Sequence, residues 1–247
     1  MDNSVLFGGL PRSGITLLAS MLCKDKNIYV TTTSPFVEVL WRNYSIWNDP
    51  KYSGDFSTEN MKQARLPFLL ALTEAYYMQL TDKPIVIDKR RQWQNVINME
   101  MYREIYGFLP KIICPVRSVT EILTSYKVLY KANGTKLNYE RLKSNMFEAS
   151  YYDLVEGYGK YPECFLLVEY NDLVDKPETT LERVYKFIGV DMPKQDFSTV
   201  VASEYEGDHG IKGLHTLRNT LSKDKSDPQQ VLTKEEFEKF SSWDFWR

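Results

Sequence analysis

Short apolar segments alternate with longer segments of helical periodicity from residue 4 to about residue 190 of this chain. The first helical segment, Gly14–Cys23, shows the pattern well, since its apolar residues recur at intervals of three and four. Such alternation predicts an α/β fold with three layers, α/β/α, in which a central parallel sheet is covered by helices on both faces. The expected strands are 4–8, 28–30, 84–88, 111–116 and 164–169. The expected helices are 14–23, 36–47, 58–80, 94–106, 119–131, 138–158 and one that ends at Gly189, and Pro67 should bend or interrupt the third of them.

The composition changes after residue 190. Residues 203–230 are rich in Gly, Lys, Asp and Ser, with only brief apolar pieces, which is too little to build a second hydrophobic core. We therefore expect a single domain over residues 1–247. Residues 190–247 would form a loop-rich extension of it that ends in a short helix near 234–240.

Charge and cysteine content limit the partners. The formal net charge is −2 and the pI is near 5.9, so no global basic field favours nucleic acid. No apolar run reaches the roughly 18 residues of a membrane span, and the first residues lack the features of a signal peptide. Three cysteines cannot all pair, which favours free thiols and a cytoplasmic location. An anionic ligand would have to be bound by a local cluster of donors.

The segment Gly9-Leu-Pro-Arg-Ser-Gly-Ile-Thr16 lies between the first expected strand and the first expected helix. A glycine loop in that context directs unpaired backbone N–H groups and the positive end of the helix dipole at one point, which makes an anion site. The loop departs from the nucleotide triphosphatase pattern, because Ile15 stands where that pattern has the phosphate-binding lysine. Arg12 supplies a cation within the loop instead.

Pro11-Arg12-Ser13-Gly14-Ile15-Thr16 resembles the P-[KR]-S-G-T-T loop of sulfotransferases that use 3′-phosphoadenosine 5′-phosphosulfate (PAPS). The loop looks most like those of the protein-tyrosine and bacterial-type sulfotransferases. The resemblance implies a P-loop NTPase-like sulfotransferase fold and binding of the 5′-phosphosulfate by these six residues, largely through backbone donors. Ile15 departs from the family, which often has Thr there, and this implies a weaker site but not a lost one.

Three further segments match the same family. Arg117 ends an expected strand and Ser125 follows eight residues later in a helix, the spacing with which the family binds the 3′-phosphate. Tyr170, in the segment 167–177, is implied to approach the nucleotide. The family also closes a C-terminal basic loop over the 3′-phosphate, for which Lys212 or Arg218 could serve.

Catalysis of sulfuryl transfer requires positioned cations, because charge develops on the bridging oxygen as PAPS becomes PAP. Arg12 and Lys89 are the catalytic candidates, and no metal is expected. The position at which the protein-tyrosine enzymes carry a basic Glu falls here on Thr32 or Thr33. Glu38 is the preferred base; Asp88 is another option, and the only histidines, His209 and His215, lie in the late segment.

Two other readings of the sequence stay open. The segment 84–88 resembles the strand and Asp that hold Mg²⁺ in P-loop kinases, with Thr16 as a second ligand, so a small-molecule kinase using Mg-ATP is one alternative. A nucleotide-binding module without activity is the other. The acceptor is not determined: Trp41, Tyr44 and Trp47 would suit a carbohydrate, a peptide or a small alcohol or phenol, but also ordinary packing.

Overall fold

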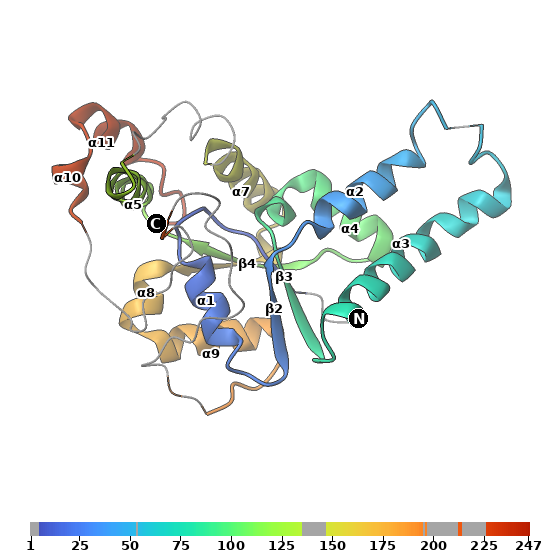
Figure 1. Ribbon diagram of the computed structural model, residues 1–247, viewed down its shortest axis with the longest axis horizontal. Coiled ribbons are helices and arrows are strands. Elements are labelled where there is room, and N and C mark those ends of the chain that lie inside the picture. The colour runs from blue at the N-terminus through green and yellow to red at the C-terminus, as the bar shows by residue number, and fades with distance from the viewer. Residues whose placement is uncertain (1–4, 53, 135–146, 195, 197–211, 214–225) are drawn as a thin grey trace.

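A central sheet of five parallel strands organises the structure, a computed structural model that describes residues 5–52, 54–134, 147–194, 196, 212–213 and 226–247 (Figure 1). The strand order is β2-β3-β1-β4-β5, and each hydrogen-bonded pair is parallel. The strands are β1 (Val5–Phe7), β2 (Ile28–Thr33), β3 (Ile85–Lys89), β4 (Lys111–Val116) and β5 (Phe165–Glu169). The predicted α/β class with a parallel sheet is therefore confirmed.

Side chains alternate between the two faces of the sheet and form a separate core on each. Val5 and Phe7 pack on one face, whereas Leu6 packs on the other. The first face is covered by α1 (Ile15–Leu22), α8 (Tyr170–Asp175) and α9 (Pro177–Ile188). The second is covered by α2 (Phe36–Ile46), α3 (Glu59–Leu80), α4 (Val96–Tyr106), α5 (Val119–Ala132) and α7 (Glu148–Lys160).

The strand order reverses beside β1. From β1 the chain moves outward to β2, returns to β3 next to β1, and then crosses to β4 and β5 on the opposite side. At such a reversal the loops that follow two neighbouring strands run to opposite sides, which leaves a crevice at the carboxyl ends of these strands. Open α/β sheets bind their ligands in this crevice. The loops after β1 and β4 flank this crevice, and these are the loops that carry Arg12 and Arg117.

Several elements differ from the sequence-based expectations. β2 runs three residues further than 28–30, and a 3-10 turn η1 (Arg91–Gln94) precedes α4. We expected Pro67 to bend or interrupt α3, and the helix is not interrupted there. Pro67 lies on the exposed side of α3, where water can bond the carbonyl that lacks its helical partner. The start of the helix expected over 138–158 lies outside the described residues, and α7 covers its remainder.

The C-terminal residues pack on the second core. After a 3-10 turn η3 (Pro162–Cys164), β5 and α9, the chain ends with α10 (Pro228–Val231) and α11 (Lys234–Phe240), which matches the helix predicted at 234–240. Phe240 is buried in that core. The Asp244 carboxylate accepts a hydrogen bond of 2.8 Å from the Val119 N–H at the start of α5, and Arg247 pairs with Glu169 at 3.1 Å. These last residues thus tie the start of α5 to the end of β5.

None of the helices in the described part of the chain is long and apolar enough to span a membrane.

Candidate active site

The loop between β1 and α1 is fixed by contacts with η1 and β4. The Gly9 N–H donates to Oε1 of Gln94 at 2.5 Å, and the Leu10 N–H donates to the Pro115 carbonyl at 3.4 Å. Ser13 is fully buried, and its hydroxyl donates to the Leu10 carbonyl at 2.6 Å. The Ser13 side chain therefore braces the loop from within, and any anion contact would come from the surrounding backbone.

The start of α1 offers backbone donors to an anion. The first helical bond runs from the Leu18 N–H to the Gly14 carbonyl, so Ile15, Thr16 and Leu17 have no carbonyl of their own helix to bond. Gly14, the residue before the helix, contributes no capping side chain. The partial positive charge of the helix end adds to these N–H groups.

Arg12 connects the loop to the second predicted phosphate site. Its φ of 63° is in the left-handed region, which is uncommon for a residue with a side chain and recurs at functional sites. From this conformation Nε donates to Oγ of Ser125 at 3.3 Å, although the two residues are 113 positions apart. The two anion sites predicted from separate motifs therefore meet.

Tyr170 lies between the phosphate loop and Arg117. The Arg117 guanidinium carbon is 4.5 Å from the centroid of the Tyr170 ring, a cation–π contact. The ring also touches the loop, since a Cβ added to Gly14 would come within 2.6 Å of Cδ2 of Tyr170. Arg117 is further oriented by Glu121, whose carboxylate accepts from Nε at 2.8 Å. Arg117, Tyr170 and the loop form one contiguous surface at the crevice.

Three consecutive basic residues at the end of β3 have different surroundings. Lys89 is buried in register with Phe7, the last residue of β1, and its N–H donates to Oγ1 of Thr31 at 2.8 Å. Arg90 forms an ion pair with Glu38. Nη1 of Arg91 donates to the Ser150 hydroxyl at 3.5 Å. Burial lowers the pKa of Arg91, and the nearby Tyr126 phenol partly opposes this shift. Lys89 is thus placed at the level where the phosphate loop begins.

The two candidate bases have different surroundings. Glu38, in the first turn of α2, is held by Arg90 and accepts a hydrogen bond from Nε2 of Gln92 at 3.2 Å. Asp88 is almost completely buried and accepts from Nε1 of Trp93 at 2.7 Å. Burial raises the Asp88 pKa. Because Asp88 is turned into the core, its position argues against the roles of base and of Mg²⁺ ligand considered from the sequence.

Of the remaining predicted residues, Lys212 is described and lies near the carboxyl end of α5. The Lys212 carbonyl accepts a hydrogen bond of 3.0 Å from Nδ2 of Asn133. Asn133 caps the end of α5, eight residues after Ser125. Arg218, His209 and His215 lie outside the described residues. Within the described ranges no three His, Cys, Asp or Glu side chains converge as metal ligands would.

Gln94 was missed by the sequence analysis. It is fully buried, and its side chain joins Gly9 to the Ser150 carbonyl at 2.5 Å. Nothing in its sequence context distinguishes it from a surface glutamine.

The profile of the Sulfotransferase family matches residues 4–194, a range that contains all five strands and the phosphate loop. The chain belongs to the sulfotransferase family. No curated protein matches it in sequence.

Solved sulfotransferases share the fold. The mouse sulfotransferase SULT7A1, solved in complex with PAP, has a TM-score of 0.54 at 14% identity, covering 98% of this chain and 83% of its own. The sulfotransferase domain from the curacin biosynthetic pathway has a TM-score of 0.51 at 17% identity, covering 96% of this chain and 91% of its own. The corresponding domain of the Synechococcus PCC 7002 olefin synthase gives 0.51 at 19% identity, covering 89% of this chain and 90% of its own. These similarities establish the architecture of this sulfotransferase.

Proposed function

We propose that this sulfotransferase moves a sulfuryl group from PAPS to a hydroxyl or amine of an acceptor and releases PAP. The contact between Arg12 and Ser125 carries the proposal. Because this contact joins a residue of each proposed anion site, it supports a single bisphosphorylated nucleotide as the ligand of both. The PAP bound to the mouse neighbour of the same fold supports this choice of nucleotide.

The binding roles follow the two sides of the crevice. Residues Pro11–Thr16 would bind the 5′-phosphosulfate through the loop backbone and the start of α1. Arg117 and Ser125 would bind the 3′-phosphate, since a guanidinium can donate two parallel hydrogen bonds to phosphate oxygens. Tyr170 would contact the nucleotide from its place between them, and Lys212 and Arg218 are the proposed basic residues of the closing segment.

PAPS supplies the sulfuryl group, and its 5′-phosphate carries the negative charge that develops as the S–O bond breaks. Arg12 and Lys89 would stabilise that charge, because both belong to segments at the carboxyl ends of β1 and β3. Glu38 is the proposed base for the acceptor proton, with Arg90 orienting its carboxylate. The free thiols of Cys23, Cys114 and Cys164 support a cytoplasmic location.

Ligand-dependent thermal unfolding separates this proposal from the alternatives. Saturation with PAP, at about a hundredfold over its dissociation constant, should stabilise the protein by about 2.7 kcal/mol. Transfer from labelled PAPS to a panel of carbohydrates, peptides and phenols then tests the reaction itself. Stabilisation by Mg-ATP without any effect of PAP would refute the sulfotransferase proposal. Stabilisation by PAP with no transfer to any acceptor would favour the inactive module.

A further inference from the structure

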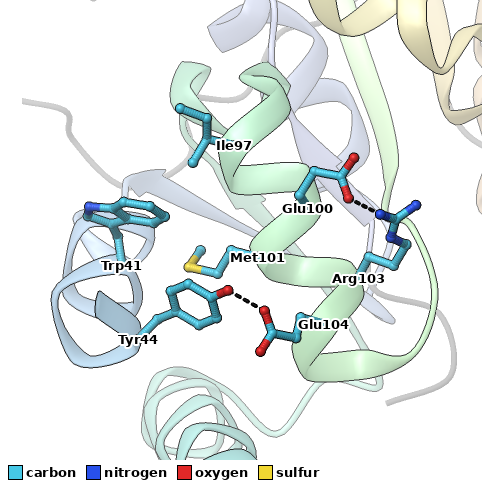
Figure 2. A pocket seen from close by; sticks show the side chains of 7 residues that line it. All are labelled: Trp41, Tyr44, Ile97, Glu100, Met101, Arg103 and Glu104. Carbon is cyan, nitrogen blue, oxygen red and sulfur yellow. Dashed lines mark hydrogen bonds and ion pairs between the residues drawn. The ribbon is translucent and has the colours of Figure 1, made fainter. Parts of the chain in front are cut away.

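A hollow lies between α2 and α4 (Figure 2). Its volume is about 440 Å³, which is in the range of small-molecule sites. Among the described residues, those that line it come from these two helices: Trp41, Tyr44, Ile97, Glu100, Met101, Arg103 and Glu104. We refer to it as the α2/α4 groove.

The groove presents an aromatic surface. Trp41 and Tyr44 stack with ring centroids 5.7 Å apart and an interplanar angle of 29°. Trp41 is 37% exposed and Ile97, across the groove, is 59% exposed. Figure 2 shows the two rings on α2 facing α4, with Met101 between the helices. An indole that is this accessible offers a flat apolar face to a ring-shaped ligand.

Charged groups surround the aromatic surface, and their charges are largely compensated. Glu104 accepts from the Tyr44 hydroxyl and pairs with Arg65 at 2.9 Å. Glu100 pairs with Arg103 and, at 3.0 Å, with Lys160. These interactions orient the carboxylates but leave acceptor capacity, since each carboxylate has about four lone-pair directions. The rim can therefore accept and donate hydrogen bonds without selecting a strongly charged ligand.

The groove adjoins the proposed base. Trp41 follows Glu38 by three residues in α2, so the two side chains lie on neighbouring positions of one helix face, about 4.5 Å apart along the axis. Gln92 connects α2 with α4. Its side chain donates to Glu38 on α2, and its backbone carbonyl accepts a hydrogen bond of 2.8 Å from Nδ2 of Asn98 on α4. A ligand in the groove can thus extend a reactive group toward Glu38.

We propose that the α2/α4 groove binds an uncharged sugar ring of a carbohydrate acceptor, an inference that rests on the proposed sulfuryl transfer. A pyranose has an apolar face of C–H bonds, which fits the Trp41 indole, and a rim of hydroxyls, which fits Glu100, Arg103 and Glu104. The exposure of Ile97 and the charged rim argue against a phenol, since sites for apolar rings usually enclose them. The sugar in the groove would be next to the one that is sulfated, because the proposed base lies beyond the groove's end.

Calorimetric titration with neutral trisaccharides tests the groove without any transfer reaction. Maltotriose, cellotriose and triacetylchitotriose are the probes. We expect at least one to bind, Trp41→Ala to weaken that binding about tenfold or more, and Trp41→Phe, which keeps an aromatic face, to weaken it less. Phe108→Ala is the matched control, since Phe108 is 42% exposed and does not line the groove.

PAP titration of the same samples separates the two proposals. Wild-type protein that binds PAP but none of the three trisaccharides would overturn the groove assignment alone. Unchanged trisaccharide affinity in Trp41→Ala, or an equal loss in Phe108→Ala, would also overturn it. Absence of PAP binding would instead refute the proposed function.

Discussion

Replacing Gly14 with alanine should disrupt the contact between the phosphate loop and Tyr170. Gly14 has a φ of +95°, and the left-handed conformation costs a residue with a Cβ about 1–2 kcal/mol. The new methyl would also come within 2.6 Å of Cδ2 of Tyr170, and overpacking of this kind costs about 1–3 kcal/mol. The free energy of unfolding should therefore fall by about 2–5 kcal/mol in Gly14→Ala.

A second glycine supplies the matched control. Gly107, which caps α4, has a φ of +81°, and no atom lies within 4 Å of the position its Cβ would take. Gly107→Ala should lose only the backbone part, about 1–2 kcal/mol, in urea denaturation. Gly14→Ala should also bind PAP about tenfold or more weakly, because a displaced Tyr170 ring no longer supports Arg117.

The double variant Gly14→Ala/Tyr170→Ala isolates the steric part. Without the ring, the alanine at position 14 should lower the free energy of unfolding by about as much as Gly107→Ala does. Only Gly14 is close to Tyr170, so only its substitution should depend on that ring. Equal losses of stability in the two single glycine variants, together with no relief in the double variant, would refute a tight contact between Gly14 and Tyr170.

Four further changes test the site and the core. Arg117→Ala should weaken PAP binding by about 1.5–3 kcal/mol in calorimetry, the range for a charge-assisted hydrogen bond, and unchanged affinity would remove Arg117 from the site. Lys89→Ala should lower turnover of labelled PAPS while PAP affinity is kept; a parallel loss of both would indicate a structural role. Glu38→Gln should abolish transfer with PAP binding retained, and a fully active variant would exclude Glu38 as the base. Burial raises the pKa of Tyr106 from 10.0 to about 12. Between these two pH values the folded state keeps the phenol proton that the unfolded chain has lost, so the free energy of unfolding falls as the pH rises. Wild type should therefore lose about 1.5–2 kcal/mol more than Tyr106→Phe between about pH 9.5 and about pH 11.5 in urea denaturation, and parallel curves would contradict this.

The sheet and the phosphate loop could be predicted because their signals are local. The apolar run before Gly8 and the helical periodicity after Gly14 sit within a few residues of each other, and the strand, loop and helix appear there as expected. The same holds for β4 followed by α5, and for the helix that ends at Gly189. In each case the period of the apolar residues determines which face is buried.

The contacts that complete the site could not be predicted in this way. The bond between Arg12 and Ser125 and the bond between Gln94 and Gly9 join residues far apart in sequence, so no local pattern encodes them. The short helix α8, which begins at Tyr170, was also not anticipated. Glu38 was selected as the base from its place after β2, but its ion pair with Arg90 depends on how β3 ends against α2.

The anchoring of Asp244 and Arg247 has a practical consequence for handling this enzyme. One of these residues holds the first turn of the helix that bears Ser125, and the other holds the residue next to Tyr170. Cleavage by a protease near residue 241 would release both contacts and so loosen the two walls of the crevice that carry Ser125 and Tyr170. The affinity for the proposed nucleotide can therefore also serve to test whether residues 241–247 are intact in a preparation.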